Sequence, residues 1–330
     1  MTVLCSPRCS VRLLHLRRQK LRPVQQTFPT ALGSGRNKNS KVESLSGSRG
    51  VSQLFNCSWL VEFPFDPLLH SVTLWAPSLS LSTMQSMEVQ PHIRLRKEDV
   101  EPVVIIVGDP ARTEEVANMC EKKQELAYNR EYRSFRVVYD SQPITVISHG
   151  IGCPGTSIAI EELAYLGAKV IIRAGTCGSL KPKTLKQGDV CVTYAAVNET
   201  GLISNILPEG FPCVATPHVY QALMDAAKEL GIEAASGIGV TQDYFYQNGI
   251  LPSKLEMYSK CCDVIDMEMS GVLGLCQARG IATCGILAVD GSPLQWDEGD
   301  YDATGVKATT GKENMIKITL KACANLRRQY

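Results

Sequence analysis

The stretch VVIIVGDPARTEEVANMC, residues 103–120, contains the pattern that decides the fold. It begins with five consecutive β-branched apolar residues, which predict a strand that is buried on both faces. Gly108 and Pro110 end that strand, and a helix is expected from Ala111 to Cys120. A buried strand that leads directly into a helix is typical of α/β proteins, in which helices cover both faces of a sheet.

The same alternation recurs along the chain. Further apolar runs that predict strands are Ile144–Ser148, Val170–Arg173, Val190–Thr193, Gly237–Thr241, Val264–Met267 and Ile281–Val289. The helical stretches among them are Thr156–Leu166, His218–Leu230, Ser270–Arg279 and Lys312–Arg328. In the last helix, one face collects the apolar residues Met315, Ile318, Ala322 and Leu326. We therefore predict one α/β domain with a central mixed, mostly parallel, twisted sheet flanked by helices.

The N-terminal quarter has a different composition. Residues 1–86 contain ten basic and three acidic residues and carry +7, whereas residues 87–330 carry −6 within a whole-chain charge of +1. The segment is rich in serine and lacks apolar periodicity, so low order is expected. A transit peptide has such a composition, but we favour a dispensable leader before an internal start at Met84 or Met87. The folded domain is predicted to span residues 87–330.

Composition and missing motifs narrow the function classes. The near-zero charge suggests neither nucleic acid nor a membrane as a partner, and no apolar run is long enough for a transmembrane helix. Thirteen cysteines without a CxxC pair indicate a reduced, cytoplasmic protein. No histidine has metal-ligand spacing, and neither GxSxG nor a P-loop occurs. We expect no metal and no cofactor.

Two predicted strands are followed by glycine and arginine. Gly108 and Arg112 come after the first strand, and Arg173 with Thr176 comes at the end of the run from Val170. Glycine lets backbone N–H groups approach a ligand and a guanidinium adds a forked donor, so both corners suit a phosphate dianion. Taken singly, Arg112 fits a solvated turn and Arg173 fits a structural ion pair. Two such corners on one sheet edge favour phosphate.

The loop Gly150–Gly155 matches GxGxxG, the fingerprint of dinucleotide-binding folds. That fingerprint requires an acidic residue about 20 positions later, at the end of the next strand, to bind the ribose. Arg173 stands at that end instead. We therefore expect a loop that approaches phosphate or sugar, not a nicotinamide site.

Carboxylates and aromatic rings follow the later strands. Glu268 could accept hydrogen bonds from a sugar diol or simply begin a helix, and Asp266 precedes it. Asp290 stands at the tip of a long apolar run, where desolvation favours the neutral acid, although a loop or cap role also fits. Phe245 and Trp296 offer stacking surface for a flat ring, but each is also an ordinary core residue.

Six ordered motifs carry a resemblance to a known family. They are IVGDPAR (106–112), AYNREY (127–132), SHGIGCPG (148–155), VIIRAGTCGSL (170–180), DMEM (266–269) and VDGSPLQWDEGD (289–300). Together they resemble the hexameric purine nucleoside phosphorylases of the nucleoside phosphorylase family, and the apicomplexan parasite enzymes most of all. The resemblance covers about residues 88–330 and implies the nucleoside phosphorylase fold. Residues 1–86 show no such likeness.

The resemblance implies a role for each motif residue. Gly108, Arg112, Arg173 and Thr176 would bind phosphate, together with Arg130 from a neighbouring subunit. Met267 and Glu268 would bind ribose, together with His92 of PHIRLRKED (91–99) from the same neighbour. The base site would contain Cys177, Gly178, Phe245, Asp266 and Trp296, and Asp290 would act on the purine. Many relatives have Glu in place of Asp266, so Asp266 is given a weaker role. A close relative has Tyr in place of Phe245, so a hydroxyl contact at that position is not expected here.

The implied reaction is the reversible phosphorolysis of inosine or guanosine to a free purine and ribose 1-phosphate, a step of purine salvage. The partners would be nucleoside, phosphate and further copies of the chain, with a dimer as minimum and a hexamer expected. Phosphate would attack C1′ while Asp290 supplies a proton to the leaving base. Uridine phosphorylase and methylthioadenosine phosphorylase or nucleosidase activities are the alternatives within the family. A nucleoside-binding module without turnover is the alternative outside it.

Overall fold

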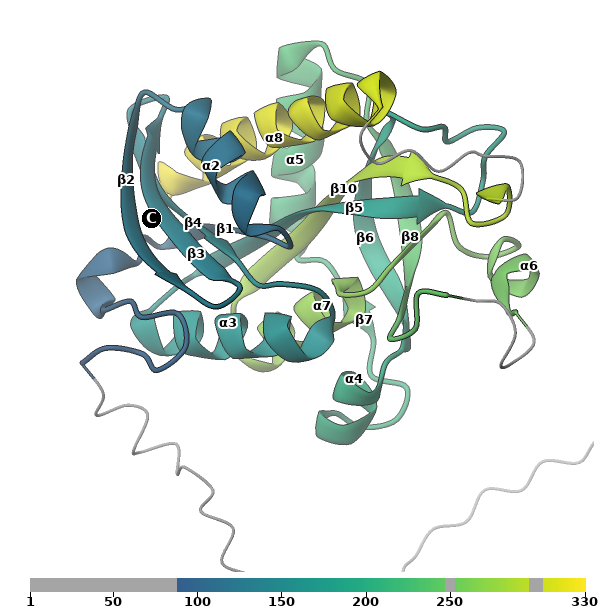
Figure 1. Cartoon of the computed structure of the whole chain (residues 1–330), viewed down its shortest axis with the longest axis horizontal. Helices are drawn as coiled ribbons and strands as arrows, with labels where there is room; N and C mark the ends of the chain where they lie inside the picture. Colours follow the sequence, from purple (N-terminus) through teal and green to yellow (C-terminus); the bar gives the residue numbers. More distant parts are fainter. Residues whose placement is uncertain (1–87, 247–252, 297–304) are drawn as a thin grey trace, which may run out of the picture. The chain divides into compact units, whose positions relative to one another are not determined.

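The first strand leads directly into a helix, as its sequence predicts. In the computed structural model, which describes residues 88–246, 253–296 and 305–330, β1 (Val103–Val107) is buried along its whole length and precedes α2 (Pro110–Asn118) (Figure 1). Asp109 caps this helix, because its Oδ1 accepts a hydrogen bond from Ala111 N at 2.8 Å. The predicted leader, residues 1–86, lies outside the described residues, so the domain boundary stays a prediction.

The remaining elements alternate between strands and helices. The other described strands are β2 (Lys122–Asn129), β3 (Tyr132–Tyr139), β4 (Gln142–Ser148), β5 (Val170–Ser179), β6 (Val190–Glu199), β7 (Cys213–Val214), β8 (Ala235–Gln242), β9 (Val264–Asp266) and β10 (Ala282–Gly291). The other described helices are η1 (Lys97–Asp99), α3 (Cys153–Leu166), α4 (Gly201–Ile206), α5 (Pro217–Leu230), α6 (Leu255–Tyr258), α7 (Met269–Ala278) and α8 (Val306–Arg327).

All the described strands belong to one mixed sheet. Its order is β10-β6-β8-β9-β5-β1-β4-β3-β2, with β7 paired to β6. Since β10 also pairs with β5, the strands β10, β6, β8, β9 and β5 form a closed ring, from which β1, β4, β3 and β2 extend. Among the strands that the sequence predicts, parallel pairing prevails, and the hairpin β2–β3 with its neighbour β4 is antiparallel.

Helices cover both faces of the sheet. One core cluster packs α2, α5 and α8 against one face, and two others pack α3 and α7 against the opposite face, as Figure 1 shows for the extended part of the sheet. The predicted apolar face of α8 is confirmed, because its four residues are at most 1% exposed (Met315, Ile318, Ala322 and Leu326).

The sequence missed the hairpin β2–β3. Strand β2 is exposed along most of its length, so the apolar run that marks a buried strand is absent there. It forms because β3 pairs with it on one side and with the buried strand β4 on the other. The hairpin turns at Arg130, which has a left-handed backbone conformation with φ of 55°.

Strand β5 is longer than predicted, which changes the place of Arg173. The apolar run ends at Ile172, yet the strand continues to Ser179 through parallel pairing with β10. Arg173 therefore lies within the strand, opposite Ile106 of β1 and Gly285 of β10, and not at its end. An apolar run in the sequence shows only the part of a strand that packs against helices. The rest of β5 forms because it pairs with β10, which is more than 100 residues away in the sequence, and no local pattern shows this pairing.

Candidate active site

One cavity of about 640 Å³ opens where the strands converge on β5. Strand β1 runs parallel to β5 and places Ile106 opposite Arg173, whereas β9 runs antiparallel to it and places Ile265 opposite Gly178. The carboxyl ends of β1 and β9 therefore reach the middle of β5 from opposite directions. Two features make this convergence: β9 pairs antiparallel with β5, and β5 continues past Arg173 to Ser179.

Most of the residues predicted for the site line this cavity. They are Gly108, Arg112, Arg173, Thr176, Cys177, Gly178, Phe245, Asp266, Met267, Glu268, Asp290 and Trp296. Gly150 and Ile151 also line it, as expected of the loop 150–155. The sequence reasoning named no site role for six further lining residues: Asp109, Pro110, Gln242, Tyr244, Ile265 and Pro293. These six lie beside predicted strand ends, so the strand-end rule applied to every neighbouring residue would have found them.

Two guanidinium groups in the cavity have donors without partners. Arg112 Nε and both Nε and Nη1 of Arg173 are buried and make no hydrogen bond within the described part of the chain. Burial lowers the pKa of Arg112, and the charge of Arg173 lowers it further. Buried donors of this kind cost free energy until a ligand accepts from them. Two cations that also repel each other fit an anion between them.

Gly175 gives Arg173 its place in β5. A Cβ atom on Gly175 would lie 1.5 Å from Arg173 Nη1, so the guanidinium lies directly over this glycine. Burial lowers the pKa of Arg173, but the carboxylates of Glu268 and Asp266 more than offset this and leave it raised. The group is therefore cationic although its side chain is only 4% exposed.

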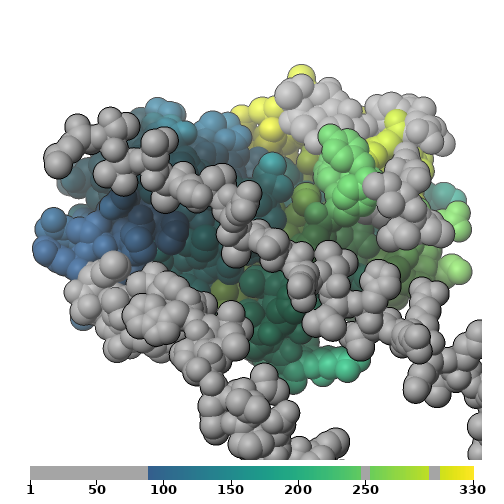
Figure 2. Space-filling model, turned by 60° about the horizontal axis from the view of Figure 1, so that its bottom comes forward, coloured from purple at the N-terminus to yellow at the C-terminus, as the bar shows by residue number. Residues whose placement is uncertain are grey.

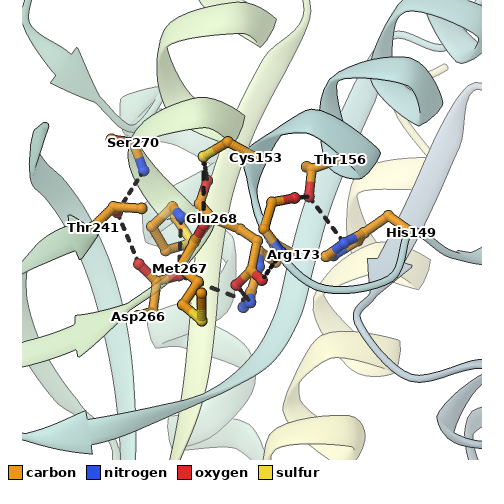
Figure 3. Close-up of polar contacts among 11 residues, drawn as sticks. His149, Cys153, Thr156, Arg173, Thr241, Asp266, Met267, Glu268 and Ser270 are labelled. Atoms are coloured by element: carbon orange, nitrogen blue, oxygen red, sulfur yellow. Dashed lines mark hydrogen bonds and ion pairs between the residues drawn. The ribbon is translucent and has the colours of Figure 1, made fainter. Parts of the chain in front are cut away.

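Glu268 is held by two donors (Figure 3). Its Oε1 accepts from Gly152 N at 2.6 Å and its Oε2 accepts from Arg173 Nη2. Burial raises the pKa of Glu268, but Arg173 outweighs it and the net shift is downward. An ionised carboxylate has about four acceptor positions, so two of them remain for the hydroxyls of a sugar.

Asp266 is engaged with protein groups on both oxygens (Figure 3). Its Oδ1 accepts from Thr241 Oγ1 at 2.8 Å, and its Oδ2 accepts from Met269 N at 2.9 Å and from Glu268 N at 3.2 Å. Burial raises its pKa to about 6. This carboxylate caps the first turn of α7 and so positions Glu268, and this arrangement favours a supporting role over direct contact with a base.

His149 lies beneath the loops that approach the guanidinium groups. It is fully buried, its Nδ1 lies 2.9 Å from Thr156 Oγ1, and its backbone N donates to Val107 O at 2.9 Å (Figure 3). Burial and the charge of Arg173 lower its pKa to about 3, so the imidazole is neutral. The sequence reasoning had not singled it out, because a lone histidine carries no spacing signal.

Asp290 lies near the end of β10 and faces the same cavity. Burial raises its pKa to about 6, and hydrogen bonding with Thr176 and the charge of Arg112 only partly oppose this. The expected neutral acid is therefore accessible near neutral pH. The rings of Phe245 and Trp296, which also line the cavity, lie with centroids 5.0 Å apart.

His92 and Arg130 do not line the cavity of their own chain. The segments that carry these two residues are in contact with each other. Asn129 directly precedes Arg130, and its Nδ2 donates a hydrogen bond to His92 O at 2.7 Å. Arg130 is exposed and the side chain of His92 is 40% exposed. Figure 2 shows the first described residues, in blue, at one side of the molecule. The two residues predicted to act in a neighbouring subunit thus share one edge of the molecule.

Within the described residues, no cluster of three or more His, Cys, Asp or Glu side chains could hold a metal ion. None of the described helices has the length and apolar character to span a membrane.

Comparison with known proteins identifies the class. A profile of the Phosphorylase superfamily matches residues 102–324, and the chain belongs to this family. The matched region begins just before β1 and ends within α8, so it includes all the strands among the described residues.

Particular relatives narrow the comparison. A crystal structure of purine nucleoside phosphorylase from Toxoplasma gondii in complex with immucillin-H is 99% identical, with a TM-score of 0.74 over 75% of this chain and 100% of that one. A purine nucleoside phosphorylase of Plasmodium vivax is 44% identical over 74% of this chain and 99% of its own length. A uridine phosphorylase of Escherichia coli is 40% identical over only 47% of this chain and 62% of its own.

Proposed function

We propose that this chain is an enzyme that catalyses the reversible phosphorolysis of purine ribonucleosides, giving a free purine and ribose 1-phosphate. One observation carries the proposal: the unpartnered buried donors of Arg112 and Arg173 share a cavity with the carboxyl group of Asp290, whose pKa is about 6. The purine nucleoside phosphorylases among the relatives support it, since they match nearly their whole length.

In the proposed arrangement, phosphate and nucleoside bind to different groups of the cavity. Phosphate binds between Arg112 and Arg173 beside Gly108 and Thr176, where the guanidinium groups neutralise its charge and aim one oxygen at C1′. The C1′–N9 bond breaks as the C1′–O bond to phosphate forms. Asp290 gives its proton to N7 of the leaving purine, and the reverse reaction returns it.

The remaining groups of the cavity hold ribose and base. Glu268 accepts from the ribose hydroxyls and stabilises the positive charge that develops at C1′. Met267 packs against the sugar, and Cys177 with Gly178 lies beneath the base. The tilted pair Phe245 and Trp296 offers a wall for the flat ring. Phosphate supplies the nucleophile and Asp290 the acid, so the proposed reaction needs no cofactor.

The alternatives within the family have weaker support. The uridine phosphorylase relative matches a smaller part of this chain than the purine enzymes do. Gln247, which could read a uracil, lies outside the described residues. A nucleosidase uses water, and two buried guanidinium groups in the cavity would then lack a substrate anion. A binding module without turnover would have no use for an acid at Asp290.

A substrate panel tests the proposal. Wild-type protein is assayed with inosine, guanosine, uridine and methylthioadenosine, each with and without inorganic phosphate. We expect rapid release of free purine from inosine or guanosine only when phosphate is present. Equal rates in phosphate-free buffer contradict phosphorolysis, and preferred cleavage of uridine contradicts the purine assignment.

We also propose that the active unit is at least a dimer, and a hexamer in its full form, because His92 and Arg130 share one edge outside their own cavity. Mixing tests this: Arg130→Ala and Asp290→Asn chains, each inactive alone, recover activity together after subunit exchange if Arg130 acts in the neighbour's site. A fully active monomer, or no recovery after proven exchange, contradicts it.

The proposed location is the cytoplasm, supported by ten free cysteines among the described residues. Fractionation of the cells that contain the protein tests this.

A further inference from the structure

A buried carboxylate stands behind His92. Glu162 lies on α3, and its side chain is 1% exposed. It accepts from His92 N at 3.1 Å and from Ile93 N at 2.8 Å, and its Oε1 lies 2.5 Å from His92 Nδ1. Burying a carboxylate is costly unless its oxygens are satisfied. Here one short surface segment supplies three donors to the same group.

The segment around His92 is fixed from its other side as well. Asn129 Nδ2 donates to His92 O, so both the N–H and the C=O of residue 92 are held by side chains of distant elements. Ile93 and Leu95 are completely buried against α3, and Gln90 N donates to Leu95 O at 2.9 Å. The His92 side chain, which is 40% exposed, is thus attached to a backbone segment that is fixed on both sides. Such preorganisation is typical of groups that meet a ligand.

The carboxylate also determines which ring nitrogen carries a proton. A carboxylate that accepts from backbone N–H groups has no proton to give, so His92 Nδ1 must be the donor. With its proton on Nδ1, the ring presents Nε2 as an acceptor, and Nε2 makes no hydrogen bond within the described part of the chain. An acceptor in this position suits a hydroxyl group that donates.

We propose that Glu162 is a positioning residue, which holds the His92 ring in the Nδ1–H form so that Nε2 accepts from the ribose 5′-hydroxyl of a nucleoside in the neighbouring subunit. This inference rests on the proposed function. Glu162 would touch no substrate itself, and recognition of the 5′-hydroxyl would depend on it through His92.

The test compares inosine with 5′-deoxyinosine, which lacks the hydroxyl. In Glu162→Gln, the amide oxygen can still accept from Ile93 N, but an NH2 group in place of Oε1 can no longer accept from His92 N and Nδ1, so the ring loses the contacts that hold Nε2 at the hydroxyl. Losing one neutral hydrogen bond corresponds to about 2- to 10-fold in affinity. We expect the KM for inosine to rise by about this factor with little change in kcat, and both constants for 5′-deoxyinosine to stay unchanged.

Two controls separate this role from simple damage. Glu161→Gln alters the adjacent residue of α3, whose carboxylate pairs with Arg279 at 2.9 Å, and it should behave like wild type. In a His92→Ala background, Glu162→Gln should have no further effect, because its contribution acts through the ring. If Glu162→Gln fails to fold, Asn129→Ala is used instead, because it removes the hydrogen bond to His92 O. We then expect the same result, a higher KM for inosine and unchanged constants for 5′-deoxyinosine.

Three results would overturn the proposal: an equal loss for both nucleosides, a further loss in the His92→Ala background, or a wild type with the same KM for both nucleosides. A wild type that shows no phosphate-dependent cleavage of inosine would instead refute the proposed function, and this inference with it.

Discussion

Replacing Asp290 by asparagine should make the protein more stable and less active at the same time. The carboxyl group is partly buried beside Thr176, and its folded pKa is about 6 against an ordinary 3.8. Asparagine keeps the shape and the capacity to form hydrogen bonds but cannot give a proton. The desolvation that raises the pKa of Asp290, and so makes it a useful acid, therefore also lowers the free energy of unfolding once the group is ionised.

The magnitude follows from the shift in pKa. Each pKa unit corresponds to about 1.4 kcal/mol, so the ionised group reduces the free energy of unfolding by up to about 3 kcal/mol. Since the folded pKa lies above the unfolded one, this penalty is absent below pH 3.8, grows as the pH rises, and is complete above about 6. Asparagine is itself polar and buried, so a net gain of about 1–3 kcal/mol remains at pH 8.

The assay measures both quantities on the same samples. Thermal unfolding at pH 8 should show a Tm that is higher by roughly 3–9 °C in Asp290→Asn, and no gain at pH 4. Turnover of inosine with phosphate should fall by about 10²–10⁴, the usual contribution of a general acid. Equilibrium binding of phosphate should be close to that of wild type, because Arg112 and Arg173 remain.

Each readout can refute a different step. Unchanged turnover would show that Asp290 is not the acid. A lower Tm at pH 8 would show that the carboxylate is stabilised in the fold and that its pKa is not raised. A Tm gain that is equal at pH 4 and pH 8 would show that the effect comes from packing and not from charge.

Other substitutions test the neighbouring parts of the structure. Gly175→Ala places a Cβ 1.5 Å from Arg173 Nη1 and so displaces the guanidinium. We expect calorimetry to show a loss of phosphate binding and circular dichroism to show that the fold is retained. Normal phosphate binding would contradict the position described for this guanidinium over Gly175. Asp266→Ala removes the acceptor at the start of α7 and should lower the free energy of unfolding in urea by about 1–2 kcal/mol at pH 4, where the folded pKa of about 6 leaves no charge penalty, and no change at that pH would refute the cap. Ile318→Ala opens the α8 core and should cost about 2–5 kcal/mol with kcat intact, whereas a loss of kcat would connect α8 to the site.

The sequence located most of the site because its signals are local. Glycine and arginine after an apolar run, an acid at the tip of another run and a ring beside a third each mark a strand end. The structure brings Arg112, Phe245 and Asp290 into one cavity. Local patterns could not show that β9 runs antiparallel to β5, or that β5 continues past Arg173, because both depend on pairing between residues far apart in the chain.

Periodicity of apolar residues by itself determined the α/β class, the helix face of α8 and the strands buried on both sides, since these follow from which side chains must leave water. Tertiary structure alone decided the closed ring of strands, the exposed strand β2 and the ionic state of the buried groups. A pKa depends on burial and on charges nearby in space, such as Arg173 beside Glu268. The same holds for Glu162 and His92, which are 70 residues apart in sequence and meet only after folding.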